Sequence, residues 1–172
     1  TQNMDKLLRI LAKATGCVVF SVDYRLAPEH PFLAAVDDCY AALQWVAQTA
    51  QQFCADPACL AIAGESAGGN LAAVTALRIR DEGGPTIAAQ FLIVPATDLR
   101  TEKHVDPDLN RLDWFYEKYV PDAVERRSRL ASPLLAPDHA NLPPVFIYTA
   151  ECDVLRDEGY AYSQKLEQAG VP

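Results

Sequence analysis

A serine flanked by glycines is the residue whose setting in this sequence points most directly to chemistry. Gly64, Ser66 and Gly68 form a Gly-x-Ser-x-Gly pattern, and Gly69 adds a further glycine. An apolar run at residues 60–63 precedes the pattern and an alanine-rich stretch follows it, which is typical of a tight turn between a strand and a helix. Glycines there avoid side-chain clashes and tolerate a strained backbone. We therefore predict that the Ser66 hydroxyl is exposed at a nucleophile elbow.

A carboxylate is expected at the same edge of the predicted sheet. Asp153 directly follows the apolar run at residues 144–150, and reactive groups gather at the carboxyl ends of parallel strands. An acid in this place can orient a histidine whose other ring nitrogen takes the serine proton. Asp153 is thus predicted as the acid of a catalytic triad. Ordinary helix starts, with Ser66 as an N-cap and Asp153 satisfying backbone N–H groups, are the alternatives.

The sequence also bears on the oxyanion hole and on the general base that such a site requires. The backbone N–H of Ala67, directly after the serine, is predicted to donate to the oxyanion of a tetrahedral intermediate, although such a hole needs at least one more donor. The three histidines, His30, His104 and His139, are interpreted as exposed or structural rather than as the general base. A serine hydroxyl without a base is a weak nucleophile.

Apolar runs alternate with helical patterns along the chain, which indicates an α/β fold with a parallel sheet and helices on both faces. We expect strands at residues 17–22, 60–63, 87–94 and 144–150, and helices around residues 4–11, 33–46, 66–80 and 156–168. The chain is predicted to form a single domain, 1–172, with a helical cap-like insertion at about 98–138. The aromatic run Trp114, Phe115 and Tyr116 within it either lines an acyl pocket or packs inside the cap.

Composition narrows the range of partners. The 172 residues carry a net charge of −8, so a nucleic-acid surface is not expected, and no apolar run approaches the ~20 residues of a membrane helix. Five cysteines at irregular spacing make a poor disulfide framework; a local bridge from Cys54 to Cys59 is the alternative. Reduced thiols predict a cytoplasmic protein. We expect no metal and no cofactor, because no cysteine or histidine cluster has metal-ligand spacing.

Four motifs in combination resemble the hormone-sensitive lipase family of microbial carboxylesterases. They are DYRLAPEHPF at residues 23–32, GESAGG at 64–69, SPLL at 132–135 and LRDEG at 155–159. The resemblance implies an α/β-hydrolase fold, with Ser66 as the nucleophile, Asp153 as the acid and a preference for short acyl esters. It also implies that the 98–138 insertion helps to cover the active site. A homodimer is a family-level expectation.

The sequence departs from the family pattern in two residues and in its extent. Glu65 stands where aspartate is usual, and Val154 replaces the usual proline. The family's His-Gly-Gly-Gly oxyanion loop and one strand would precede Thr1, and its catalytic histidine would follow Pro172. We therefore expect the interior of a longer enzyme. The missing strand should either leave a gap between the strands predicted at 17–22 and 60–63 or force a new pairing there.

Two functional hypotheses follow. The first is serine-dependent hydrolysis of carboxylic esters through an acyl-enzyme. The second is a catalytically incomplete fragment or a non-catalytic ligand-binding protein on the same scaffold.

Overall fold

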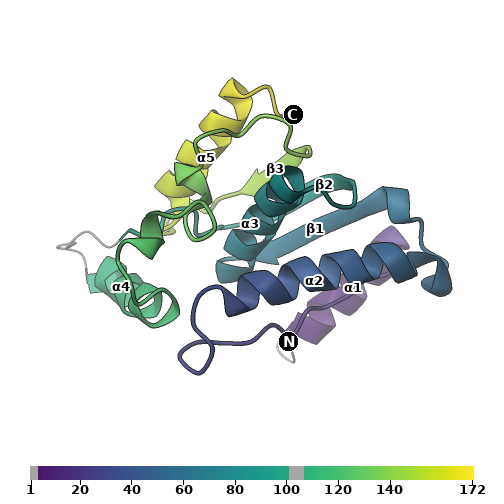
Figure 1. The fold of residues 1–172 in the computed structure, drawn as a ribbon, viewed down its shortest axis with the longest axis horizontal. Helices are drawn as coiled ribbons and strands as arrows, with labels where there is room; N and C mark the ends of the chain where they lie inside the picture. Colours follow the sequence, from purple (N-terminus) through teal and green to yellow (C-terminus); the bar gives the residue numbers. More distant parts are fainter. Residues whose placement is uncertain (1–3, 101–106) are drawn as a thin grey trace.

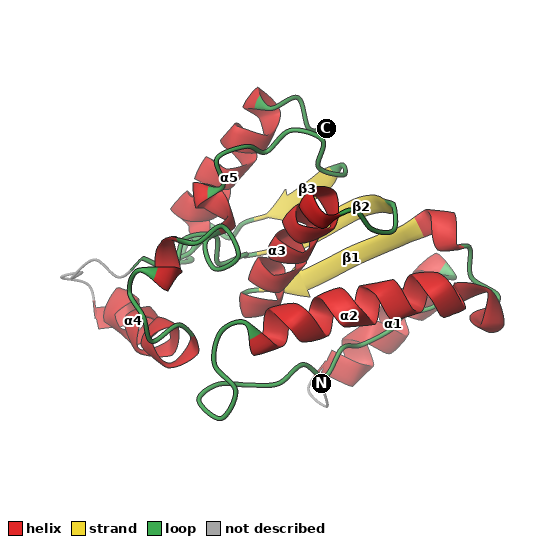
Figure 2. Cartoon of the chain, in the orientation of Figure 1, coloured by secondary structure: helices red, strands yellow, loops and turns green. Residues whose placement is uncertain are grey.

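The computed structural model describes residues 4–100 and 107–172, in which helices alternate with the strands of one sheet (Figures 1 and 2). The helices are α1 (Asp5–Thr15), α2 (Ala34–Thr49), α3 (Ala67–Glu82), α4 (Pro107–Tyr119) and α5 (Arg156–Gln168). The strands are β1 (Leu60–Glu65), β2 (Ile87–Ile93) and β3 (Val145–Tyr148). No described helix combines the length and apolarity that a bilayer crossing requires.

The three strands pair in the order β1-β2-β3 and all run parallel. In this register Glu65 lies opposite Ile93, and Ile93 lies opposite Tyr148. The carboxyl ends of all three strands therefore meet at one edge of the sheet, where the arrowheads point toward α4 in Figure 2. The predicted α/β class with a parallel sheet is confirmed.

The main core lies between one face of this sheet and the helices α2, α3 and α5. Leu92 of β2 and Leu77 of α3 are fully buried in the same cluster. Helix α3 contacts β1, β2 and α2, so it is covered on several sides. Its small residues, such as Ala73 and Ala76, allow this close approach. The helix after the elbow is thereby held firmly against the sheet.

The opposite face of the sheet is exposed among the described residues, and we call it the open face. Phe91 and Ile93 of β2 are 42% and 39% exposed, and Phe146 and Tyr148 of β3 are 67% and 65% exposed. The rings of Phe91 and Phe146 stack with centroids 5.4 Å apart. None of the residues of α1 is buried. The covering helices thus protect one face, and the aromatic side chains of the other face meet water.

The predicted strand at residues 17–22 is wrong, because this segment carries no strand in the structure. Its Phe20 packs edge-on against Trp45 of α2 and against Phe53, with centroids 5.9 Å and 5.1 Å away. Val18 is 46% exposed. An apolar, β-branched run becomes a strand only where a neighbour completes its hydrogen bonds. Among the described residues no strand pairs with the outer edge of β1, and residues 17–22 form neither a strand across a gap nor a new pairing with β1.

The segment predicted as a helical insertion contains α4 and two short 3-10 helices, at Glu125–Arg127 and Pro133–Leu135. Tyr116 of α4 is 9% exposed and packs with Leu99 and Leu155 in a second core cluster. Trp114 and Phe115 point elsewhere and are 55% and 49% exposed. Of the three aromatic residues, only Tyr116 therefore packs inside.

The two faces of the sheet predict different costs of truncation. Leu92→Ala should lower the free energy of unfolding by about 2–5 kcal/mol, because it leaves a cavity in the buried cluster. Phe146→Ala on the open face should cost less than about 1 kcal/mol. Urea denaturation of both variants measures this contrast. Equal costs would mean that the open face is covered in solution.

Candidate active site

Ser66 stands at a sharp turn between β1 and α3. Its backbone has φ 54° and ψ −115°, a left-handed conformation that L side chains rarely adopt. The Ser66 N–H donates to the Ile93 carbonyl oxygen at 2.9 Å, and the Ser66 carbonyl oxygen accepts from the Asn70 N–H at 3.0 Å. The residue is exposed. The strained conformation is therefore held by the neighbouring strand and the following helix, and the side chain meets solvent.

The glycines around the serine differ in whether a side chain would fit at their positions. A Cβ on Gly64 would lie 2.0 Å from the carbonyl oxygen of Gly68, and one on Gly69 would lie 2.9 Å from Pro95 Cβ. A Cβ on Gly68 would meet nothing within 4 Å. The predicted clash holds for Gly64 and Gly69, but not for Gly68, whose backbone is the surface that Gly64 contacts.

Asn70 locks the elbow to the loops beside it, a role that the sequence analysis missed. Its side chain is 2% exposed, and its Nδ2 donates to the carbonyl oxygens of Ala96 at 2.7 Å and Ala131 at 2.8 Å. The signal in the sequence was a lone amide at the start of an otherwise apolar helix. A buried amide requires such partners, so Asn70 joins three segments that are distant in sequence.

Asp153 follows β3 by five residues and lies in the turn that leads into α5. Its Oδ1 accepts from the Leu155 N–H at 2.8 Å, and its carbonyl oxygen accepts from the Arg156 N–H at 3.1 Å. The helix-start role that was the alternative interpretation is thus present. It leaves the second carboxylate oxygen, Oδ2, able to serve another partner. Because Ser66 follows β1, the two predicted residues follow the outer strands of the same sheet at the same edge.

Ala67 is the first residue of α3 and is exposed. The first N–H groups of a helix have no acceptor within the helix and carry part of the positive end of its dipole. The Ala67 N–H therefore has the electrostatic character that an oxyanion donor requires. Its catalytic role stays a prediction.

The described histidines have other partners. His139 is 5% exposed, its Nε2 lies 3.0 Å from the Pro133 carbonyl oxygen, and its ring meets Tyr162 edge-on at 5.6 Å. Burial lowers the pKa of His139, which keeps it neutral. His30 lies on an exposed loop, and His104 is outside the described residues. Both described histidines fit the exposed or structural interpretation.

Glu158 on the first turn of α5 was not recognised from the sequence as a member of the site. Its Oε1 accepts from the N–H groups of Thr97 at 2.5 Å and Asp98 at 3.3 Å. Burial raises the pKa of Glu158 to about 7, with smaller contributions from the charges of Asp98 and Asp153, while the two backbone hydrogen bonds oppose the rise. An acidic residue in this place is thus half-protonated near neutral pH.

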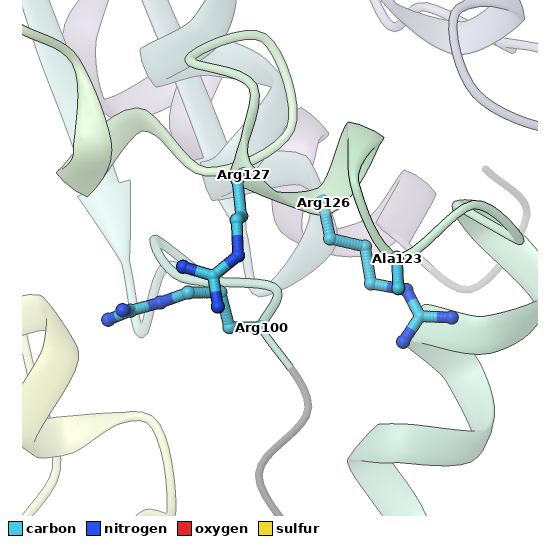
Figure 3. A pocket seen from close by; sticks show the side chains of 4 residues that line it. All are labelled: Arg100, Ala123, Arg126 and Arg127. Atoms are coloured by element: carbon cyan, nitrogen blue, oxygen red, sulfur yellow. The ribbon is translucent and has the colours of Figure 1, made fainter.

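A pocket of about 110 Å³ lies apart from these residues and is lined by Arg100, Ala123, Arg126 and Arg127 (Figure 3). The guanidinium of Arg126 donates to the Val120 carbonyl oxygen at 2.7 Å, and Arg100 pairs with Asp98. The predicted site residues do not line this pocket. In the described part of the chain, no three His, Cys, Asp or Glu side chains gather as metal ligands.

Comparison with known proteins places this arrangement in a family. A family model described as the alpha/beta hydrolase fold matches residues 1–172. The chain belongs to the α/β-hydrolase family. This hydrolase chain is 45% identical to carboxylesterase NlhH of Mycobacterium tuberculosis, over 97% of its own length and 56% of the relative's. It is 41% identical to an arylesterase of Saccharolobus solfataricus, over 98% and 58%.

A solved structure gives the same result for this α/β hydrolase. A hyperthermophilic esterase from the archaeon Pyrobaculum calidifontis matches with a TM-score of 0.92 and 44% identity, covering 98% of this chain and 58% of that one. The hydrolase chain therefore spans a little more than half the length of the relatives it matches. The resemblance to hormone-sensitive lipase-like esterases is confirmed at the level of the family.

The two glycines that differ in their surroundings give a paired prediction. Gly64→Ala should destabilise the hydrolase chain by more than about 3 kcal/mol or prevent folding, because the new methyl group meets backbone atoms. Gly68→Ala should leave stability unchanged or raise it by up to about 1 kcal/mol, since alanine favours the helix. Urea denaturation measures both. Similar losses at the two positions would contradict this account of the elbow.

The raised pKa of Glu158 predicts a pH dependence of stability. Protonated Glu158 is favoured in the folded state, so its stabilising contribution is complete below pH about 4.5 and is lost as pH rises through about 7. The loss is on the order of 3 kcal/mol at most. Glu158→Gln should therefore gain stability relative to the wild type between pH 5 and pH 8. Denaturation at four pH values tests this, and a difference that does not vary with pH would contradict it.

Proposed function

We propose that the protein hydrolyses carboxylic esters, with Ser66 as the nucleophile and Asp153 as the acid of a catalytic triad. The observation that carries the proposal is Ser66 on its strained turn, at the same sheet edge as Asp153. Relatives named carboxylesterase and arylesterase support it. Short acyl esters are the proposed substrates.

The spacing of the strands supports the pairing of these two residues. One strand separates β1 from β3, and neighbouring strands lie about 4.8 Å apart, so the backbones after β1 and β3 are about 10 Å apart. Two side chains with one imidazole ring between them span such a gap. The Asp153 carboxylate, held by the Leu155 N–H, would then orient the ring of the base.

The proposed reaction proceeds in two halves. A general base takes the Ser66 proton while Oγ bonds to the carbonyl carbon of the ester, and the Ala67 N–H donates to the oxyanion. The ester C–O bond then breaks, and the alcohol leaves with the proton. Water attacks the acyl-enzyme in the same way and releases the acid. His139 is buried against the Pro133 carbonyl oxygen and His30 lies on an exposed loop, so the proposal assigns the role of base to neither of them.

Further parts of the proposal concern access and setting. Helix α4 lies beyond the carboxyl ends of the strands (Figure 2), which supports a covering role for the 98–138 insertion. The five cysteines are free thiols, which supports a cytoplasmic setting.

Homodimer formation stays a prediction. A ligand-binding protein on this scaffold has no need of a strained serine, so hydrolysis is favoured over it.

Substitution of the nucleophile tests the proposal directly. Ser66→Ala should lower kcat for p-nitrophenyl acetate and butyrate by about 10⁴-fold or more, because no other group can form the acyl-enzyme. Asp153→Asn should lower kcat by about 10³–10⁴-fold while the fold persists, since the amide oxygen still accepts from the Leu155 N–H.

Ser163→Ala is the matched control, since this serine lies on α5 and its hydroxyl donates to the Tyr160 carbonyl oxygen. It should keep kcat within about twofold. Turnover by the purified wild type that Ser66→Ala leaves intact would overturn the esterase proposal.

A further inference from the structure

The backbone at residues 95–98, just after β2, lies against the serine elbow; we call it the bridging segment. The Ala96 N–H donates to the Ser66 carbonyl oxygen at 3.3 Å, and the Ala96 carbonyl oxygen accepts from Asn70 Nδ2 at 2.7 Å. Gly69 leaves no room for a side chain beside Pro95. The bridging segment is therefore fixed to the elbow by hydrogen bonds and by close packing.

The same segment is fixed on its other side to the first turn of α5. Glu158 Oε1 accepts hydrogen bonds from the N–H groups of Thr97 and Asp98. The Glu158 carbonyl oxygen accepts a hydrogen bond from Thr97 Oγ1 at 3.0 Å. A Cβ on Gly159 would lie 3.0 Å from Thr149 Cγ2, so α5 also approaches the end of β3 closely. Glu158 holds two N–H groups that would otherwise lack a partner away from water.

The first turn of α5 is continuous with the turn that carries Asp153. The Asp153 carbonyl oxygen accepts from the Arg156 N–H at 3.1 Å, and the Leu155 carbonyl oxygen accepts from the Gly159 N–H at 3.1 Å. A displacement of Glu158 is thereby transmitted to Asp153 through about one helical turn. The path from Ser66 to Asp153 through the bridging segment consists of hydrogen bonds and backbone.

We propose that Glu158 is a positioning residue, which sets the separation between Ser66 and Asp153 by holding the bridging segment against the first turn of α5. This inference rests on the proposed esterase function, in which those two residues act together. A shift of about 1 Å in such a pair can cost about 10²-fold in rate. Glu158 itself touches neither substrate nor reacting atoms in this proposal.

The charge of Glu158 also affects the proposed site, because other charged groups surround its carboxyl group. Asp98 from the bridging segment and Asp153 from the preceding turn are both carboxylates, the hydroxyl of Tyr116 approaches from α4, and Arg100 is bound to Asp98. Ionised Glu158 therefore adds negative charge beside the acid of the triad. Negative charge there stabilises the protonated form of the general base.

Two substitutions separate position from charge. Glu158→Gln keeps an oxygen that can accept from the Thr97 and Asp98 N–H groups but removes the charge. Glu158→Ala removes the acceptor. Glu167→Gln and Glu167→Ala are the matched controls, because Glu167 is an exposed glutamate at the other end of α5. Amide hydrogen exchange of Thr97 by NMR reports the contact itself and needs no catalytic activity.

The expected results differ between the two Glu158 variants. Glu158→Ala should lower kcat at least tenfold with KM changed less than threefold, and it should speed Thr97 amide exchange at least tenfold. Glu158→Gln should keep kcat within threefold and retain the amide protection. Its acidic limb in the pH profile of kcat/KM should move to lower pH by a few tenths of a unit at most, because wild-type Glu158 is only partly ionised below pH about 7. The Glu167 variants should match the wild type.

The outcomes that overturn the proposal are distinct from failure of the esterase function. Glu158→Ala with unchanged kcat overturns it, as does Glu158→Gln with an unshifted pH profile and a kcat as low as that of Glu158→Ala. Failure of Glu158→Ala to fold leaves the decision to Glu158→Gln and its pH profile. Turnover that does not depend on Ser66 would overturn the esterase function, on which this proposal rests.

Discussion

The site depends on the contact between the backbone of Gly64 and that of Gly68. A methyl group on Gly64 would lie 2.0 Å from the Gly68 carbonyl oxygen, so the chain leaves β1 and enters α3 with no space for any side chain between them. This approach forces Ser66 into a positive φ. The turn provides no acceptor for the Ser66 N–H. The neighbouring strand provides it, because the Ser66 N–H donates to the Ile93 carbonyl oxygen at the end of β2.

Buried polar side chains connect the loops that the sheet does not reach. Asn70 joins the elbow to two loop carbonyl groups, and Ser132 receives the Leu99 N–H and donates to the Arg126 carbonyl oxygen. Each of these side chains satisfies backbone groups that have no ladder or helix partner. The loops at the carboxyl edge therefore gain order from these hydrogen bonds as well as from the apolar cluster that contains Leu99, Tyr116 and Leu155.

The sequence pattern was sufficient to predict those parts of the structure that neighbouring residues determine. The glycines around Ser66 define a turn within six residues, and the alternation of apolar runs places Ser66 and Asp153 at one sheet edge. The strand expected at residues 17–22 failed because a strand needs a neighbour, which a pattern of β-branched residues does not reveal. Propensity describes the segment alone, whereas strand pairing is a property of the whole sheet.

Glu158 escaped prediction for a related reason. An acid in the first turn of a helix usually faces water and interacts favourably with the positive end of the helix dipole. Only the tertiary packing of Thr97 and Asp98 against Glu158 shows that its carboxyl group is withdrawn from water. The ion pair between Arg25 and Asp38 likewise depends on tertiary structure, because it joins two residues thirteen positions apart in the chain. Pairings across loops depend on how the segments fold back.

The open face has a consequence for the chain in solution. Stacked phenyl rings on β2 and β3 lie on the same sheet as the outer edge of β1, which has no strand partner among the described residues. Uncovered aromatic surface and a free ladder edge are the two features that drive chains to self-associate. The net charge of −8 makes copies of the chain repel one another. Salt screens this repulsion beyond a distance of about 8 Å at physiological ionic strength. Screening of this charge by salt should therefore increase self-association of the chain through the open face and the outer edge of β1.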